Sequence, residues 1–420
     1  MKKLFAIVLA LAMALSLAAC GSSSGSSSAS QSGSASGSTS SGTPTKLTLI
    51  LRGGTYADVI KAALPAFEAE NNVTCEVLDL AFDDLHSKIA LDAVNSQGAY
   101  DLCMGEGSWM AEFTANNVLA NLSEMGYSFD DDIIPETTSI CKVGNDIYLA
   151  PYFGNVTVML YNKQLLADAG ATVDDLSTWD GVMKVAKSAN TAGKKGFLIR
   201  GGSPDNIVSD FIPQLLSHGG WVVDSNNKPT VDTPEFKAAM EDYLALYKLG
   251  DTMDKDDIVA AIDNGDAAMG IGWPGWYVPK ADSNASYTVI PTKLTASDTA
   301  KKTSMYGVWT VGIPNNSQNK ELSLKLLEYI MSPEVQLASV DNGGVPCRFS
   351  VLQNKEVLAK YPQLEIVCNA LQSGVYRPVI EQWNDFTTIL GTEMDNIIQG
   401  TKTIDQGLKD AQSQLDTLMA

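Results

Sequence analysis

The chain has 420 residues, of which 45% are hydrophobic and 8% aromatic, and its formal net charge is −20 at pH 7. This hydrophobic fraction is typical of a well-packed globular protein, and no apolar run after the N-terminal region approaches the length of a membrane span. The strong excess of acidic residues repels nucleic acid and anionic lipid, so we expect neither as a partner.

The first twenty residues have the pattern of an export signal. Lys2 and Lys3 precede an uninterrupted apolar run from Leu4 to Ala19. This run is short for a membrane span but has the length of the hydrophobic part of a signal peptide. It ends in LAAC, which resembles the lipobox of bacterial lipoproteins, so Cys20 would carry the lipid and become the first residue of the mature protein. The alternative is an ordinary secreted protein, cut at a site with small residues.

Residues 21–45 form a low-complexity segment that consists almost entirely of Gly, Ser, Ala and Thr. Such a composition cannot bury enough apolar surface to fold, so we expect a disordered tether. As a flexible coil it would have an end-to-end distance of about 25 to 30 Å. The folded part should then begin near Lys46, and its length predicts two domains rather than one.

The cysteines and histidines give no sign of a metal or cofactor site. His86 and His218 are the only histidines, and neither has a cysteine or carboxylate at ligand spacing. We therefore expect no metal and no cofactor. The cysteines other than Cys20 lack paired spacing, which argues against a disulfide framework but allows one bridge; they are Cys75, Cys103, Cys141, Cys347 and Cys368.

Strand and helix patterns alternate at the start of the folded part. The expected elements are a strand over 46–54, a helix over 55–72, a strand over 73–80, a helix over 82–98 and a strand over 100–105. Pro65 is expected to break or kink the first helix. This order predicts an α/β fold with parallel strands, whose ligands lie beyond the carboxyl ends of the strands. Those ends carry residues 52–56 and 106–109.

Three later helices have clear start signals. Thr233 and Ser332 each precede a proline and a glutamate, the usual order of an N-cap, a first helical residue and an early acid. Thr403 and Gln406 have the spacing of a capping box for the last helix. We expect these segments to be scaffold rather than binding site.

Several blocks of the sequence resemble extracellular solute-binding proteins of ABC importers. The first two are VMLYNKQLLADAG at 158–170 and LSTWDGVMKVAKSA at 176–189. Further blocks follow in the order of that family, at 228–248, 264–277 and 313–352. The tail at 391–418 is similar to the closing helices of the sugar-binding group that includes maltose-binding protein. The resemblance covers nearly everything from Lys46 to Leu418.

This resemblance implies a type II periplasmic-binding-protein fold with two α/β lobes joined by hinge strands. Both lobes would be discontinuous. The N-terminal lobe would comprise residues 46–155 and 311–348, and the C-terminal lobe residues 156–310 and 349–420. The chain would cross between them near 154–157, near 309–312 and near Arg348. In this family the ligand lies in the cleft and the lobes close over it.

The stretch GDAAMGIGWPGWYVPK carries Trp273, Trp276 and Tyr277 among glycines and prolines. Gly270, Gly272, Pro274 and Gly275 prevent these rings from sharing one regular element, so we expect them on a turn. Sugars offer flat C–H faces and hydroxyl rims, which aromatic platforms and planar hydrogen-bonding groups match. We therefore predict that these three rings contact a carbohydrate.

Other residues are candidates for the same site. The first lobe can offer Trp109 and Tyr152 opposite the turn, with Glu106 and Arg52 as partners for pairs of hydroxyl groups. The remaining candidates are Trp221, Trp383 and Arg348. We assign Trp179 to packing at a helix start, and we assign Trp309 to packing in a hinge strand.

The resemblance thus implies a lipid-anchored binding component of an ABC transporter. It would capture a mono- or oligosaccharide and deliver it to a membrane permease, whose own ATPase subunits drive transport. We expect a monomer on the outer face of the cytoplasmic membrane. The tether favours a Gram-positive cell surface, and a periplasmic lipoprotein stays open as the alternative.

Two other functions remain as alternatives. The same fold could bind a polyamine, another cation or a peptide, for which the negative net charge is suitable, although no acidic cluster accompanies the rings at 270–280. A secreted glycoside hydrolase would also have an aromatic cleft with paired carboxylates. The sequence contains no nucleophile elbow, Walker loop or zinc motif, so we expect a protein that is not an enzyme.

Overall fold

The computed structural model describes residues 43–191, 193–293 and 303–420. The expected signal peptide, Cys20 and the tether up to residue 42 lie outside the described residues. Residues from Pro44 to Ala420 form one unit. No helix of the described residues is long and apolar enough to cross a membrane. The five cysteines that the structure describes are free thiols, and only Cys75 among them is partly exposed.

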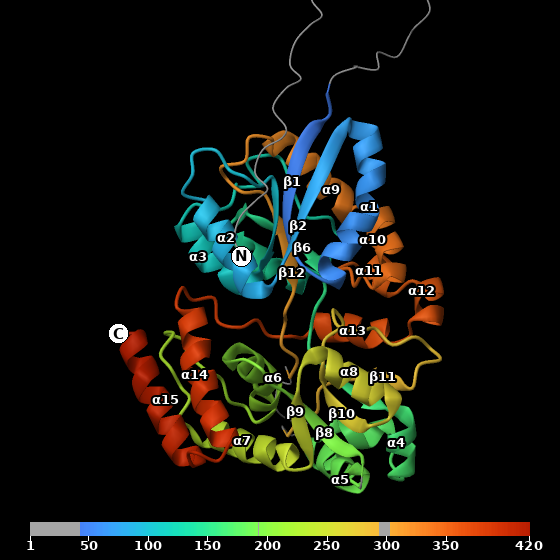
Figure 1. Cartoon of the computed structure of the whole chain (residues 1–420), viewed down its shortest axis with the longest axis vertical. Coiled ribbons are helices and arrows are strands. Elements are labelled where there is room, and N and C mark those ends of the chain that lie inside the picture. Colours follow the sequence, from blue (N-terminus) through green and yellow to red (C-terminus); the bar gives the residue numbers. More distant parts are fainter. Residues whose placement is uncertain (1–42, 192, 294–302) are drawn as a thin grey trace, which may run out of the picture. The chain divides into compact units, whose positions relative to one another are not determined.

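The first lobe contains a five-stranded sheet in the order β2-β1-β3-β12-β6 (Figure 1). Its strands are β1 (Thr45–Arg52), β2 (Val73–Leu80), β3 (Leu102–Glu106), β6 (Leu149–Phe153) and β12 (Trp309–Gly312). β1 runs parallel to β2 and β3, as the alternation of strands and helices predicts. β12 is antiparallel to both β3 and β6.

The helix after β1 continues through its proline, so the expected break at Pro65 is wrong. α1 (Thr55–Asn71) is one helix, and α2 (Phe82–Asp92) follows β2. Pro65 lies on the exposed face of α1, where water can satisfy the carbonyl group that loses its donor, while Leu64 and Phe67 beside it are buried in the core. Burial of the neighbouring side chains outweighs the one lost hydrogen bond.

The second lobe contains a five-stranded sheet in the order β11-β7-β10-β8-β9. Its strands are β7 (Val158–Asn162), β8 (Lys195–Arg200), β9 (Gly250–Met253), β10 (Ala267–Gly272) and β11 (Ala285–Thr288). β8 is parallel to β9 and to β10.

Trp179 begins α5 (Trp179–Ala189), is 2% exposed and donates from Nε1 to Ser217 Oγ at 2.6 Å, which confirms its packing role.

The two sheets share one arrangement of strands. β1 lies between β2 and β3, and β8 lies between β9 and β10, with parallel pairing in all four cases. In each lobe the central strand leads into a helix, which is α1 after β1 and α6 (Pro204–Ser217) after β8. The ends of equivalent strands can therefore face one cleft from opposite sides.

The remaining elements complete the two lobes. In the first half of the chain they are α3 (Met110–Ala115), β4 (Lys142–Val143), β5 (Asp146–Ile147) and α4 (Lys163–Asp168). The second half adds α7 (Pro234–Tyr247), α8 (Lys255–Asn264), α9 (Lys320–Met331), α10 (Pro333–Ser339), α11 (Phe349–Leu352), α12 (Lys355–Lys360), α13 (Leu364–Leu371), α14 (Trp383–Ile398) and α15 (Ile404–Leu418). Thr233 caps α7 and Ser332 caps α10, as predicted.

Three chain segments lie side by side where the lobes meet. Val156 bridges Tyr306, and Met305 bridges Val375. The backbone N–H of Thr157 donates to Met305 O at 2.9 Å, and that of Val375 donates to Ser304 O at 3.0 Å. The first segment lies in the range where the resemblance implies a crossing, near 154–157, whereas Met305 and Tyr306 lie before the range implied near 309–312. The third segment lies around Val375.

The expected lobe boundaries need two corrections. The second lobe was expected to extend to residue 310, yet Trp309 and Thr310 already belong to β12 in the first sheet. Arg348 was expected beside the third crossing, but it donates to Met331 O and to Asp130 and Asp132 of the first lobe. The third segment where the lobes meet lies later in the chain, around Val375, whose backbone N–H donates to Ser304 O.

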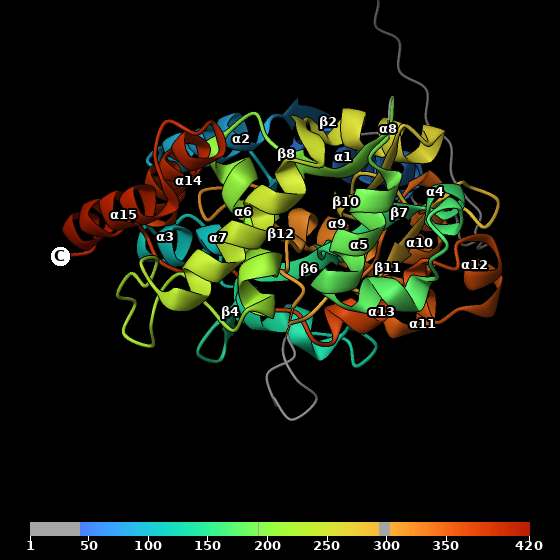
Figure 2. The ribbon, with the colours of Figure 1, turned by 90° about the horizontal axis from the view of Figure 1, so that it is seen from below.

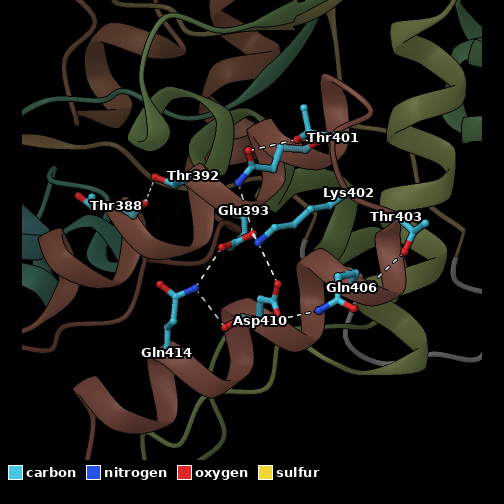
Figure 3. Close-up of polar contacts among 10 residues, drawn as sticks. Thr388, Thr392, Glu393, Thr401, Lys402, Thr403, Gln406, Asp410 and Gln414 are labelled. Carbon is cyan, nitrogen blue, oxygen red and sulfur yellow. Dashed lines mark hydrogen bonds and ion pairs between the residues drawn. The ribbon is translucent and has the colours of Figure 1, made fainter.

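The last two helices are joined by a polar network around the buried Glu393 (Figure 3). Glu393 on α14 is 6% exposed and accepts from Lys402 Nζ at 2.5 Å and from Gln414 Nε2 at 3.0 Å. Lys402 also donates to Asp410 on α15 at 2.9 Å. Bonds to these carboxylates, first to Asp410 and then to Glu393, raise the pKa of Lys402. The network therefore links α14, the connecting segment and α15.

The start of α15 differs in one detail from the expected capping box. Thr403 accepts from the backbone N–H of Gln406 at 3.2 Å, as predicted. The Gln406 side chain, however, donates to Asp410 at 2.8 Å instead of returning to the cap (Figure 3).

α14 packs along α6, and Figure 2 shows these two helices together. This packing brings α14 to the region where β8 ends.

Candidate ligand-binding cleft

A cavity of about 560 Å³ lies where the carboxyl ends of the parallel strands meet. β1 and β3 end in Arg52 and Glu106 on the side of the first lobe, and β8 ends in Arg200 on the side of the second. Trp273 follows the end of β10 directly. All four residues line the cavity, so its position is the one that parallel strands predict.

Aromatic rings form a large part of the cavity wall. Trp273, Trp309 and Tyr56 are 4%, 5% and 8% exposed, so they are firmly packed and present only small parts of their surface. Trp276 is more open, and the guanidinium carbon of Arg200 lies 4.9 Å from its ring centroid. Phe82 adds a further ring from the start of α2. Trp276 is thus the most accessible platform among the tryptophans of the wall.

The turn that carries these tryptophans is attached to the hinge. The side chain of Asn155 accepts from the backbone N–H of Gly275 at 3.0 Å and donates to Tyr56 Oη at 3.3 Å. A Cβ atom at Gly275 would lie only 2.3 Å from that same hydroxyl oxygen, so the position requires glycine. One hinge side chain therefore holds both the turn of the second lobe and the first helix of the other lobe.

Two residues of the cavity wall, Glu106 and Arg377, form a buried ion pair. Glu106 is 3% exposed, accepts from Ser108 Oγ and forms an ion pair with Arg377, which is 9% exposed. Burial raises the pKa of Glu106, and the adjacent Arg377 guanidinium acts in the opposite direction. Arg377 also lies 3.8 Å from Asp205. The pair links β3 to the segment that follows the third crossing.

Burial also changes the pKa of two further groups, Asp210, which lies outside the lining, and Tyr56, which lies in the wall. Asp210 is 1% exposed, and burial raises its pKa from 3.8 to about 7, although it accepts from Tyr243 Oη at 3.0 Å and from the backbone N–H of Arg200. Burial raises the pKa of Tyr56 to about 12, against the positive charges of Arg52 and Arg200. Tyr56, Arg52 and Arg200 all line the cavity.

Three helices begin at the cavity wall. Thr55 and Tyr56 start α1, Pro204 and Asp205 start α6, and Lys255 starts α8; residues from all three starts line the cavity. The unpaired backbone N–H groups of a helix start give it partial positive charge. The cavity is thus suited to a ligand that carries acceptor oxygens.

The structure brings four of the predicted site residues together. Arg52, Glu106, Trp273 and Trp276 line the cavity. Tyr277 lines a neighbouring pocket of about 260 Å³, which shares Thr55 and Trp276 with the main cavity. Trp273 is almost completely buried, and its ring packs against Gly307 of the hinge.

The other predicted site residues lie elsewhere. Trp109 and Tyr152 are 2% and 3% exposed in the core of the first lobe, and Trp109 supports the ring of Trp309 from behind at 5.9 Å. Trp221 packs against the core of the second lobe. Trp383 stacks on Phe386 at 5.5 Å and is 3% exposed. Arg348 is held by its ion pairs with Asp130 and Asp132.

Sequence reasoning missed Arg200, Asp205 and Arg377, and it assigned Trp309 to packing alone although that ring also lines the cavity. A signal for Arg200 was present. LILRGGT at 49–55 and FLIRGGS at 197–203 share the order apolar strand, arginine, two glycines and hydroxyl residue. Arg377 comes from an irregular segment without a pattern, so only the tertiary structure could identify it.

Comparison with known proteins agrees with this architecture. Residues 51–337 match the model of a family described as bacterial extracellular solute-binding protein. Two relatives are each 22% identical and cover 89% of this chain. One is a probable amino-acid ABC transporter periplasmic-binding protein of Sinorhizobium fredii, aligned over 387 residues and 89% of its length. The other is an arabinooligosaccharide-binding protein of Halalkalibacterium halodurans, aligned over 409 residues and 90% of its length.

Among solved structures, the maltose-bound MalE3 of T. maritima has a TM-score of 0.77 at 22% identity and covers 89% of this chain and 100% of its own. Such a likeness establishes the fold, which is the two-lobed α/β fold that the sequence blocks imply. Both family and fold are those of transport proteins. The chain belongs to the bacterial extracellular solute-binding proteins.

Proposed function

We propose that this protein captures a carbohydrate in the cavity between its lobes and delivers it to the permease of an ABC importer. The observation that carries the proposal is the lining of the cavity. An accessible tryptophan, Trp276, lies beside Arg200 and near the helix starts that offer hydrogen-bond donors. Sugars need this combination, because their C–H faces stack on rings while their hydroxyl groups bond to planar polar side chains.

The names of similar proteins support a sugar more than any other ligand. One relative is an arabinooligosaccharide-binding protein, and the structural neighbour from T. maritima holds maltose. The relative from Sinorhizobium fredii is named for amino acids, so amino acids belong in any ligand screen. A cavity of about 560 Å³ has room for more than one small sugar ring.

Ligand binding would be coupled to the relative positions of the lobes. The cavity is lined by both lobes, with Arg52 and Trp309 on one side and Arg200 and Trp276 on the other. A ligand that contacts both sides stabilises the closed arrangement by the free energy of the added contacts. The three adjacent crossing segments provide the hinge, and the closed form would dock on the permease.

The N-terminal region would keep the protein at the membrane. In this proposal the signal peptide is removed, Cys20 is lipidated and residues 21–45 form the tether. If so, replacing Cys20 by alanine should move the protein from the membrane fraction to the culture medium or periplasm. Retention of the Cys20→Ala variant in the membrane fraction would contradict lipid anchoring.

A ligand screen tests the proposed class of ligand. The full-length chain, kept in mild detergent, is heated with mono- and oligosaccharides, polyols, amino acids, polyamines and metal ions. A ligand that binds only the folded protein raises the melting temperature by mass action. We expect shifts with carbohydrates. A shift with polyamines or amino acids alone would reject the carbohydrate assignment and leave the family assignment intact.

A pair of tryptophan variants tests the position of the site. Trp276→Ala should weaken sugar binding by about ten-fold or more, because the stacked ring and its buried area are lost. Trp221→Ala is the matched control, since Trp221 is also partly exposed in the second lobe but does not line the cavity. Isothermal titration calorimetry measures both. Equal affinities of the two variants would refute the cavity as the sugar site.

A further inference from the structure

The two lobes present equivalent arginines to the cavity. Arg52 ends β1 and Arg200 ends β8, the central parallel strand of each triplet. Each arginine is followed by two glycines, and the second glycine has a positive φ, 82° at Gly54 and 91° at Gly202. A helix then begins in both lobes. The same local structure therefore delivers one guanidinium group to each side of the cavity.

Neither arginine has an ion-pair partner among the residues that the structure describes. Arg52 donates to the backbone oxygen of Leu80 at 3.2 Å. Arg200 lies over the Trp276 ring, and its Nε is buried without a hydrogen-bond partner. Trp273 Nε1, on the same wall, is another buried donor without a partner. Buried donors of this kind are costly unless a ligand supplies acceptors.

The other charged residues of the cavity wall are two cations and three carboxylates. Lys255 Nζ lies 2.6 Å from Asp256, and Arg377 pairs with Glu106 and lies 3.8 Å from Asp205. These are the remaining charged residues of the lining. With Arg52 and Arg200 the lining holds four cations and three carboxylates, so its formal net charge is +1. Arg52 and Arg200 are the two cations of the lining without a carboxylate at ion-pair distance among the described residues.

Asp210 reduces this positive charge only in part. It accepts from the backbone N–H of Arg200, not from the guanidinium group. Because burial raises its pKa to about 7, the carboxyl group is protonated in a large fraction of molecules near neutral pH. A net positive cavity in a protein with a formal net charge of −20 is a local feature that the overall composition would not predict.

We propose that the carbohydrate ligand bears one carboxylate, as in a uronic or aldonic acid, and that Arg52 and Arg200 bind this carboxylate from the two lobes. The inference deepens the proposed function and rests on it. Guanidinium groups form strong charge-assisted hydrogen bonds to carboxylates. The helix starts of α1 and α6, next to the two arginines, favour the same negative charge. Trp276 stays available to a sugar ring beside Arg200.

A single negative charge fits this cavity better than the double charge of a phosphate ester. The lining has a formal surplus of one positive charge, which one carboxylate balances and a dianion exceeds. A carboxylate that contacts both arginines would also connect the two lobes directly. Binding of the acidic sugar would then contribute to lobe closure, which neutral sugars would achieve only by weaker contacts.

Matched pairs of sugars test the charge preference. Isothermal titration calorimetry on the full-length chain in mild detergent compares D-galacturonate with D-galactose, D-glucuronate with D-glucose, and an oligogalacturonide with the corresponding neutral oligosaccharide. We expect at least one acid to bind about ten-fold or more tightly than its neutral counterpart. Glucose 6-phosphate and glutamate are included as a dianion and an amino acid.

Charge-removing variants test the two arginines. Arg52→Gln and Arg200→Gln should each weaken binding of the acidic sugar by about ten-fold or more and change binding of neutral sugars much less. Lys184→Gln is the control, because it removes the same charge from an exposed position outside the cavity. Circular dichroism establishes that each variant is folded at the temperature of the titration.

The outcomes separate this inference from the proposed function. Tighter binding of acidic sugars that depends on both arginines supports the inference. Neutral sugars that bind as tightly as their acids would overturn it and leave carbohydrate capture intact. Tighter binding of the sugar phosphate would overturn the choice of a single negative charge. Binding of glutamate without any sugar would overturn both the inference and the proposed function.

Discussion

The stability of the second lobe should depend on the protonation of Asp210. This residue lies on α6 behind the cavity and is 1% exposed. Burial raises its pKa from 3.8 to about 7. Between these two values the folded protein binds more protons at Asp210 than the unfolded chain does. The contribution of Asp210 to stability is therefore fully present below about pH 4 and is lost as the pH rises through 7.

The size of this effect follows from the difference between the two pKa values. A difference of roughly three corresponds to about 4 kcal/mol in the free energy of unfolding. Asp210→Asn removes the titration and keeps an oxygen that can accept from Tyr243 Oη and from the backbone of Arg200. The stability of the wild type minus that of the variant should therefore fall by about 4 kcal/mol between pH 4 and pH 8.

Urea unfolding at several pH values, followed by circular dichroism, measures this difference. Subtracting the variant cancels the contributions of the other carboxylates, some of which have lowered pKa values and act in the opposite direction. Asp385→Asn, an exposed substitution on α14, is the control and should show no comparable dependence on pH. A constant difference between wild type and Asp210→Asn would refute the reasoning, since Asp210 would then be ionised in the folded protein throughout.

Three further substitutions should destabilise the fold. Lys402→Met leaves the buried Glu393 without its cation and should cost roughly 1–3 kcal/mol, because Lys402 itself is partly exposed. Gly250→Ala should cost about 1–3 kcal/mol or more, since a Cβ atom would lie 1.5 Å from the Phe197 backbone oxygen on the paired strand. Arg377→Met leaves a buried carboxylate on β3 unpaired and should cost about 3–5 kcal/mol. Urea unfolding measures all three.

Each of these variants has a matched control. Lys409→Met changes an exposed lysine on α15, the helix that begins two residues after Lys402, and should be nearly neutral. Gly105→Ala places a Cβ atom no closer than 3.7 Å to its neighbours within β3, so a loss equal to that of Gly250→Ala would contradict the steric argument. Adding Glu106→Gln to Arg377→Met should recover part of the lost stability. No recovery would mean that the buried charge is not the cause.

Much of the fold could be predicted from the sequence. The alternation of strands and helices predicts the parallel triplet β1, β2 and β3, because apolar periodicity and chain order are local properties. The caps at Thr233, Ser332 and Thr403 were correct for the same reason. The predicted break at Pro65 was wrong, since a local rule for proline could not show that the neighbouring side chains bury enough surface to keep α1 intact.

The site shows the limit of such reasoning. The sequence by itself determined that Arg52 and Glu106 end parallel strands and that Trp273 and Trp276 sit on a glycine-rich turn. Only the tertiary structure decided which aromatic rings face the cavity and which fill the cores, as at Trp109 and Trp383. A tryptophan has the same local signal in both roles, because its burial depends on segments distant in the chain. The role of Arg377 also depends on the tertiary structure, because its ion-pair partner Glu106 is 271 residues away in the sequence.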